Sequence, residues 1–137
     1  LFLVPGMLHC LGTVVNAPWY FAAWSQASVL GTDAWSVPGF KDARHDALLA
    51  LMDWTEKGRA PEEIVATTWT SPYVPSSGVL QQRPLCPYPK MAKWNGVGDV
   101  KVAANWRCKY FTRRAGRAEW SSDVTSRIED FRGCGME

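Results

Sequence analysis

The chain has 137 residues, of which 47% are hydrophobic and 20% charged, a composition that suits a folded globular protein and excludes intrinsic disorder. Fifteen Lys and Arg against thirteen Asp and Glu leave a formal net charge of +2, which is too balanced for a protein that binds nucleic acid through its charge. Pro, Gly and polar residues interrupt the apolar stretches, so no run of about 20 apolar residues predicts a membrane span. We therefore expect no nucleic-acid partner and no membrane partner.

The first 32 residues contain no Asp, Glu, Lys or Arg, and the chain does not begin with Met. This opening lacks the basic n-region of a signal peptide, so we expect a truncated N-terminus that starts within the buried core of a longer protein. Leu1–Val4 is a short apolar run stopped by Pro5, which predicts a strand buried on both faces. His9 would follow the carboxyl end of this strand, where open α/β sheets place ligands and catalytic groups.

The clearest predicted helix runs from about Ala43 or Ala47 to Lys57. An aspartate precedes each candidate start and suits the N-cap, and Gly58 suits a left-handed C-cap. Apolar side chains occupy two adjacent faces of this helix, so we expect most of it to be buried. A short helix is also possible around 19–29.

The segments after this helix are predicted from their local composition. A proline at a first helical position predicts a single helical turn at 61–63, and β-branched residues predict a strand at 64–70. Pro and Gly predict a loop at 71–78, an irregular extended segment at 83–89 and a turn at 96–99. An extended run is predicted at 100–106.

The composition changes after Cys108. Residues 109–137 carry six basic and five acidic side chains in 29 positions, against nine and eight in the preceding 108. We therefore divide the chain into a compact part, 1–108, and a charged tail, 109–137. Arg113, Arg114 and Arg117 leave two interpretations of the tail open, a docking site or a solvated segment.

His9 and Cys10 form the one pair that invites a chemical interpretation. No GxSxG elbow is present, which excludes a self-contained serine hydrolase, and no phosphate-binding loop occurs. The cysteines lack a CxxC pair and His45 is the only other histidine, so no metal site is predicted. We interpret His45 as a residue of the helix entry.

Several segments together resemble the C-terminal end of the tannase and feruloyl esterase family, in the same order and at the same spacing. The resemblance covers residues 1–108. The segments that carry it are Val4–Cys10 (VPGMLHC), Asp46–Leu51 with Trp54, Glu56–Ile64 (EKGRAPEEI), Arg83–Pro89 (RPLCPYP), Gly96–Asp99 (GVGD) and Asn105–Cys108 (NWRC).

This resemblance implies an α/β fold, namely the C-terminal part of an α/β-hydrolase that is incomplete on its own. The part would hold the last core strand, the loop of the catalytic His, a C-terminal helix and extended segments. The family cleaves aromatic carboxylic esters, such as galloyl or feruloyl esters, with a Ser-His-Asp triad under a large lid. His9 matches the catalytic base. In the family the Ser and then the Asp precede the His along the chain, so we expect this chain alone to lack both residues and to be inactive.

The resemblance also assigns the cysteines. Cys10 matches a cysteine that is bonded to the cysteine before the nucleophilic Ser, so base and nucleophile would be neighbours, because a disulfide holds two Cα atoms about 4.4–6.8 Å apart. In the isolated chain Cys10 would be a free thiol or mispaired. Cys86 and Cys108 would pair with each other; two buried free thiols are the alternative. Cys134 has no family counterpart.

Further expectations concern ligands and location. The substrate would be a small aromatic ester or a plant polyphenol or cell-wall ester, and the protein would be secreted. No cofactor is expected in this segment, although the family's missing lid holds calcium. Substrate-binding residues stay unknown: an aromatic patch either lines an acyl-binding surface or packs in the core, and it comprises Trp19, Tyr20, Phe21 and Trp24.

The chain departs from the family pattern after the His-Cys pair, and a competing function stays open. The family usually has a glycine-rich stretch after the His-Cys pair, whereas residues 11–15 (LGTVV) are bulkier here. The competing function is a noncatalytic binding or interaction module that uses the aromatic and basic segments.

Overall fold

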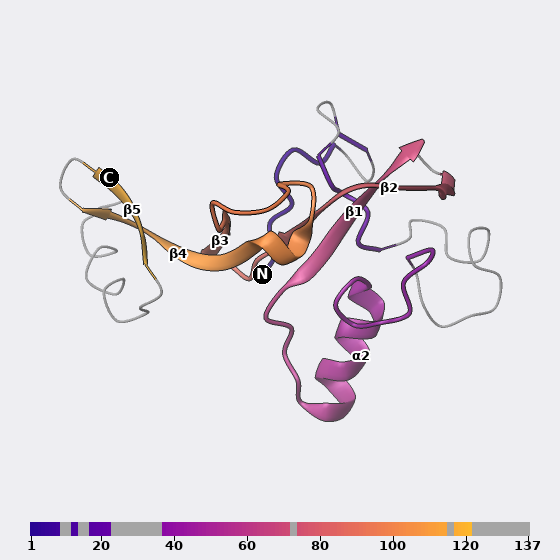
Figure 1. Ribbon diagram of the computed structural model, residues 1–137. Coiled ribbons are helices and arrows are strands. Elements are labelled where there is room, and N and C mark those ends of the chain that lie inside the picture. Colours follow the sequence, from indigo (N-terminus) through magenta and orange to yellow (C-terminus); the bar gives the residue numbers. More distant parts are fainter. Residues whose placement is uncertain (9–11, 14–16, 23–36, 72–73, 115–116, 122–137) are drawn as a thin grey trace.

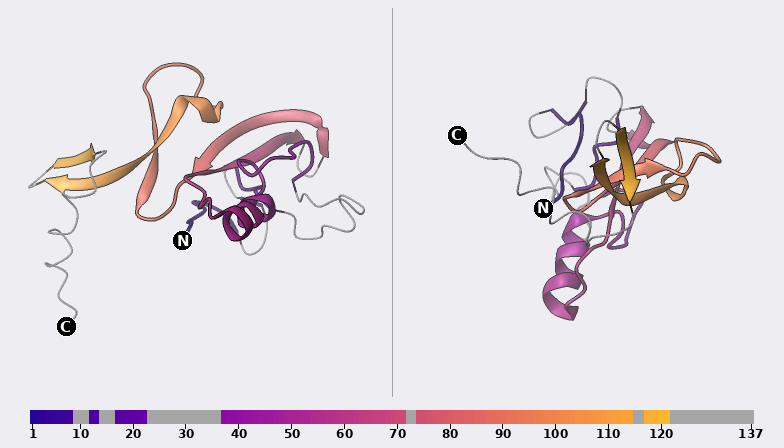
Figure 2. Two further views of the ribbon diagram at one scale, coloured as in Figure 1. Left: turned by 90° about the horizontal axis from the view of Figure 1, so that it is seen from below. Right: turned by 90° about the vertical axis from the view of Figure 1, so that its left-hand side faces the viewer.

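The computed structural model describes residues 1–8, 12–13, 17–22, 37–71, 74–114 and 117–121 (Figure 1). Its strands form two antiparallel sheets, one of β1 and β2 and one in the order β3, β4, β5, and β4 and β5 extend away from α2 (Figure 2). The elements in chain order are α2 (Ala47–Lys57), β1 (Ile64–Ser71), β2 (Val74–Leu85), β3 (Lys90–Trp94), the 3-10 helix η1 (Ala103–Asn105), β4 (Trp106–Arg114) and β5 (Arg117–Ser121).

Strand β1 is the centre of the fold, and its first six residues are buried. Strand β2 pairs antiparallel with one edge of β1, with Thr67 opposite Gln82. Along the other edge, the Tyr20 amide donates to the Thr67 carbonyl at 3.0 Å and the Thr67 amide donates to the Tyr20 carbonyl at 2.9 Å. The β-branched residues that predicted this strand therefore lie in a position with backbone partners on both sides.

The two faces of β1 carry two separate apolar clusters, because successive side chains of a strand point to opposite faces. On one face Trp69 packs with Trp19, Tyr20 and Val37. On the other face Ile64 and Ala66 pack with Leu85 of β2 and Ala50 of α2. Helix α2 is therefore attached to the sheet mainly through the side of the helix that carries Ala50.

The predicted helix is confirmed, with its start at Ala47. Asp46 is the N-cap and is fully buried; its Oδ1 accepts hydrogen bonds from the amides of Leu48 at 2.8 Å and Leu49 at 3.4 Å. Its Oδ2 accepts a further bond from the Val37 amide at 3.0 Å, which ties the helix start to the first apolar cluster. Gly58 is the left-handed C-cap with φ of 67°, as predicted.

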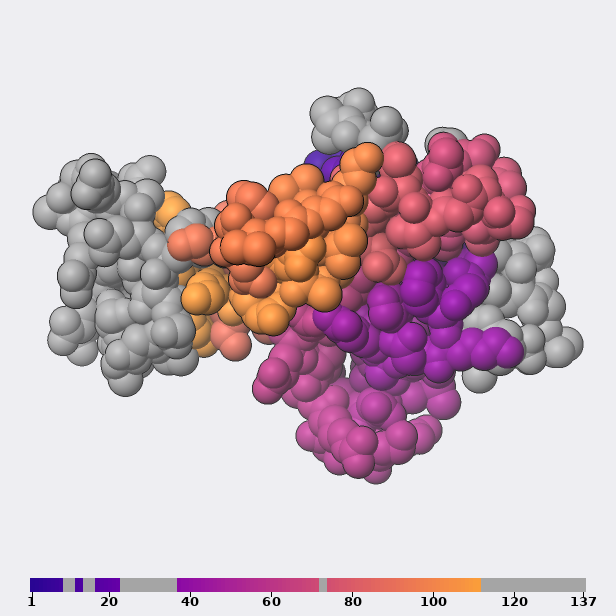
Figure 3. Space-filling model, in the orientation of Figure 1, coloured from indigo at the N-terminus to yellow at the C-terminus, as the bar shows by residue number. Residues whose placement is uncertain are grey.

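The expected burial of this helix is wrong for the described part of the chain. Leu51 is 53% exposed and Trp54 is 50% exposed, and Ala50 is the one buried residue of the helix. The helix projects from the sheets, as Figure 3 shows, so among the described residues only one of its two apolar faces meets a neighbour.

Two predictions about strand β2 need correction. The loop expected at 71–78 is wrong at Ser71, which is the last residue of β1, and again from Val74 on, where β2 begins; Ser71 and Val74 are paired. The irregular segment expected at 83–89 is also wrong at its start, because residues 83–85 complete β2. Pro84 is tolerated opposite Val65 because the Val65 amide donates to the Arg44 carbonyl and so points away from β2. The Val65–Pro84 pair therefore does not need the backbone N–H that proline lacks.

Other predicted elements differ from the structure because neighbouring contacts override the local pattern. Leu1–Val4 forms a single β-bridge, from Phe2 to Pro87, and is not a buried strand, since Leu1 is 80% exposed. Residues 61–63 form no helical turn and lead directly into β1. The run expected at 100–106 is wound into a turn and η1, because the Asp99 carboxylate accepts from the Lys101 amide at 2.8 Å.

The remaining predictions concern a turn, a short helix and the division of the chain at Cys108. The turn at 96–99 is confirmed, with positive φ at Gly96 and Gly98. Of the helix considered around 19–29, the described residues 19–22 are not helical, and the rest lies outside the described residues. Strand β4 continues through Cys108 and pairs with β5, while the division of the chain at 108 stays a prediction. In the described part, no helix is long and apolar enough to cross a membrane.

Candidate functional site

The predicted base His9 and its neighbour Cys10 lie outside the described residues. The residues on either side of them are tied together: the Leu8 amide donates to the Gly12 carbonyl at 3.0 Å, and Met7 forms an antiparallel bridge with Thr13. These two contacts fix the positions where the chain enters and leaves the segment that carries His9.

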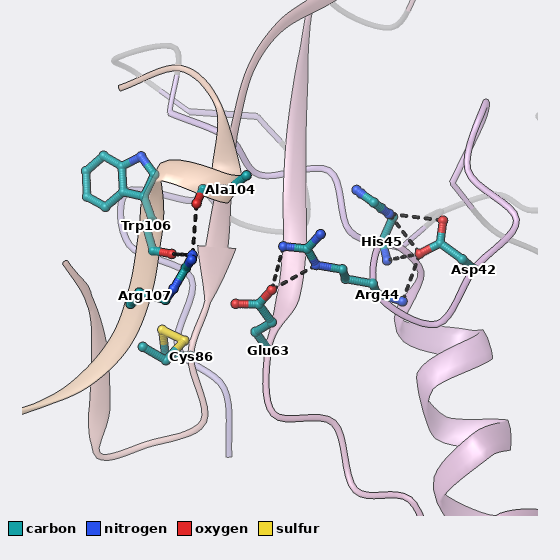
Figure 4. A network of polar contacts seen from close by, with 9 residues as sticks. Asp42, Arg44, His45, Glu63, Cys86, Ala104, Trp106 and Arg107 are labelled. Carbon is teal, nitrogen blue, oxygen red and sulfur yellow. Dashed lines mark hydrogen bonds and ion pairs between the residues drawn. A yellow bond between two sulfur atoms is a disulfide. The ribbon is translucent and has the colours of Figure 1, made fainter. Parts of the chain in front are cut away.

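The second histidine, His45, has the structural role that the sequence predicts. It directly precedes the N-cap of α2, and its Nδ1 lies 2.8 Å from Oδ1 of Asp42 (Figure 4). Its ring stacks on Phe40 with centroids 4.3 Å apart. Nearby, Arg44 forms an ion pair with Glu63 at 2.7 Å, which joins the helix entry to the approach to β1.

The structure joins Cys86 to Cys108 by a disulfide, the pair that the family resemblance implies, with Cα atoms 5.5 Å apart. Cys86 follows the last residue of β2 and is buried, whereas Cys108 lies within β4 (Figure 4). The bridge therefore connects the β1–β2 sheet to the β3–β4–β5 sheet.

A cavity of about 400 Å³ lies beside this disulfide. Its walls come from Leu3 and Pro5, residues 17–18, 83–86 and 88–92, and Trp106 and Phe111 of β4. The lining is mostly apolar, and the volume falls within the range of about 300–1,000 Å³ that is usual for small-molecule sites. The N-terminal wall belongs to the segment that leads to His9.

Arg83 is the most unusual polar residue of this cavity. Its guanidinium carbon lies 4.0 Å from the ring centroid of Trp106, a cation–π geometry. The Trp106 ring is itself fixed, since its Nε1 donates to the Val100 carbonyl at 2.9 Å. Nε of Arg83 is buried and has no hydrogen-bond partner among the described residues, and this burial lowers the pKa of Arg83.

The predicted aromatic patch packs in the core where the structure describes it. Trp19 and Tyr20 are 7% and 3% exposed, and the Tyr20 ring meets Trp69 edge-on with centroids 4.8 Å apart. Burial, with a smaller contribution from the charge of Asp46, raises the pKa of Tyr20 above its ordinary value. Trp24 lies outside the described residues, and these contacts favour core packing over an acyl-binding surface.

Sequence reasoning gave no substrate-binding residue, and it missed the cavity around Arg83. The available signal was weak: Arg83 and Trp106 both fall within segments that resemble the family, but 23 positions separate them. Within the described residues, no group of three or more His, Cys, Asp or Glu is placed to hold a metal ion. The calcium site expected in the lid stays a prediction.

Residues 1–109 match the family model described as tannase and feruloyl esterase. The chain belongs to the tannase and feruloyl esterase family. An esterase of Xanthomonas campestris is 35% identical over 133 residues, which are 93% of this chain and 21% of that protein. A mono(2-hydroxyethyl) terephthalate hydrolase of Piscinibacter sakaiensis is 39% identical over 109 residues, 79% of this chain and 13% of that protein.

Solved structures of the family agree with this assignment. An esterase from Aspergillus oryzae superposes with a TM-score of 0.54 at 28% identity, covering 75% of this chain and 18% of that one. Feruloyl esterase B from the same organism gives a TM-score of 0.52 at 26% identity, covering 75% and 17%. The likeness supports an α/β-type fold, and this family member spans 13–21% of the length of the relatives and structures described here.

Proposed function

We propose that this chain is the C-terminal part of an α/β-hydrolase that cleaves carboxylic esters, and that it supplies the catalytic base, His9. The nucleophilic serine and the aspartate of the triad would come from other parts of the same polypeptide. The observation that carries the proposal is the family match over residues 1–109, which includes the block Val4–Cys10.

The chemistry assigned to His9 is that of a general base and then a general acid. His9 takes the proton of the serine hydroxyl while the serine oxygen attacks the ester carbonyl, and it returns that proton to the departing alcohol. It then activates a water molecule that hydrolyses the acyl-enzyme. The aspartate holds the imidazole in the correct tautomer.

The contacts that flank His9 support this role. A catalytic base has to be held close to the geometry in which it receives the proton, because small displacements reduce the rate strongly. The bond between the Leu8 amide and the Gly12 carbonyl, with the bridge between Met7 and Thr13, fixes both ends of the short segment that carries His9.

The proposed substrates are small aromatic esters, of galloyl or feruloyl type. Support comes from the names of the relatives, which include the terephthalate ester hydrolase and a probable feruloyl esterase B of Aspergillus clavatus, 31% identical over 78% of this chain and 18% of that protein. We also place the protein in an oxidising, extracellular compartment, because the Cys86–Cys108 disulfide is the kind of bond that persists there.

The test is an assay of methyl ferulate and methyl gallate cleavage. The polypeptide encoded by the whole reading frame is expected to cleave at least one of the two esters, and the 137-residue chain is expected to cleave neither. Turnover by the 137-residue chain that disappears in the His9→Ala variant would contradict the assignment of the serine and aspartate to other parts of the polypeptide. Absence of turnover by both proteins would favour the binding module.

A further inference from the structure

We propose that the cavity beside the Cys86–Cys108 disulfide is a binding site for a small aromatic carboxylate, with Arg83 as the residue that pairs with the carboxylate. The inference goes beyond the proposed ester cleavage and does not depend on His9. It rests on the size of the cavity, on the position of Arg83 in its lining and on the charge of the lining residues that the structure describes.

Arg83 provides the polar anchor of the site. Arg83 lines the cavity, and its Nε is buried without a hydrogen-bond partner among the described residues. Because Nε itself is buried, a carboxylate that enters from solvent would pair with the two terminal nitrogens of the guanidinium. A guanidinium group presents its donors in a planar fork that matches both oxygens of a carboxylate. The guanidinium carbon lies 4.0 Å from the centroid of the Trp106 ring, and this cation–π contact restricts where the group lies, so a carboxylate would meet a positioned partner.

The charge of the lining favours an anion. None of the lining residues that the structure describes is acidic, whereas Arg83 and Lys90 both contribute. Nζ of Lys90 lies 5.4 Å from the ring centroid of Tyr110, and among the described residues neither Arg83 nor Lys90 forms an ion pair. A carboxylate entering the cavity would therefore meet two positive charges and no lining carboxylate.

The apolar walls favour a flat ring on the ligand. Trp106 and Phe111 contribute aromatic rings to the lining, and four further lining residues are rigid prolines. Three lining residues are about half exposed and mark the mouth of the cavity: Leu3 at 56%, Tyr88 at 51% and Met91 at 52%. A ring can therefore enter from solvent with its carboxylate directed toward Arg83.

The test compares an aromatic acid with its neutral methyl ester. Calorimetry of the 137-residue chain is expected to show ferulate binding at least tenfold more tightly than methyl ferulate, and this preference is expected to shrink at high salt. Arg83→Gln is expected to weaken ferulate binding at least tenfold. The matched control is Arg59→Gln, at an exposed arginine after α2, which is expected to leave the affinity unchanged.

Several results would overturn the proposal. Equal affinity for acid and ester in the unmodified chain would do so without any variant, which covers the case in which Arg83→Gln fails to fold. Unchanged ferulate affinity in a folded Arg83→Gln variant would do so as well, as would no binding of either ligand. Ferulate binding to the 137-residue chain but not to the whole reading-frame product would assign the cavity to another segment of that polypeptide and also reject the proposal.

Discussion

His9→Ala is expected to lower kcat for ester cleavage by about 10⁴-fold or more in the polypeptide that contains the complete triad. Without the imidazole, the serine hydroxyl has no base to accept its proton, and the departing alcohol has no acid. Binding of the ester depends on other groups, so KM is expected to change much less than kcat. Steady-state kinetics on methyl ferulate or methyl gallate measure both constants.

The chain offers a matched control for this substitution, because His45 is its only other histidine. His45 stacks on Phe40 and contacts Asp42 at the entry to α2, so His45→Ala is expected to leave kcat within a few fold of the unmodified enzyme. If His9→Ala retained more than about a tenth of kcat, the assignment of the base would be wrong.

Loss of the Cys86–Cys108 disulfide is expected to lower the free energy of unfolding by ~3 kcal/mol, from the entropy that a bridge across about 20 residues removes from the unfolded chain. The bridge also joins the two sheets, so its loss removes the covalent link between the end of β2 and β4, while the contact of Arg83 with Trp106 remains. The variant is the double substitution Cys86→Ala with Cys108→Ala, and urea unfolding of the chain measures the effect.

A second cysteine substitution separates this effect from a general cost of removing thiols. Cys134→Ala leaves the bridge in place and is expected to change the free energy of unfolding by less than about 0.5 kcal/mol. Reduction of the unmodified chain should reproduce the loss seen in the double variant. A loss below about 1 kcal/mol in the double variant would show that the bridge contributes little to stability.

The parts of the fold that could be predicted from the sequence are those with strong local signals. Helix α2 is bounded by an aspartate N-cap and a glycine C-cap, and both act within one turn of the helix. Strand β1 was identified because its β-branched residues favour extended backbone. The turn at 96–99 follows from two glycines that adopt positive φ.

The errors concern properties that distant contacts decide. Whether Leu51 and Trp54 are buried depends on what lies against α2. Whether Pro84 can lie in a paired strand depends on the direction of the Val65 amide opposite it. The winding of the chain after Asp99 depends on one side-chain contact that a pattern of apolar residues does not contain. The short apolar run at 1–4 met a single bridge partner, so its composition predicted more burial than it has.

The candidate site divides in the same way. The resemblance, carried by several segments together, predicts the roles of His9 and Cys10 within the block Val4–Cys10. Both roles stay predictions, because these two residues lie outside the described part of the chain. The cavity around Arg83 and Trp106 is assembled from four separate segments. No contiguous pattern marks such a site, so only the structure brings these residues together.

If His9 is the catalytic base and lies beside a serine from another part of the polypeptide, Cys10 should be bonded to the cysteine next to that serine. Mass spectrometric mapping of disulfides in the non-reduced product of the whole reading frame identifies the partner of Cys10. We expect the Cys10 peptide to be joined to a peptide in which a cysteine directly precedes the nucleophilic serine. A Cys10 that is a free thiol in this product, or is joined to Cys134, would contradict the proposed position of His9.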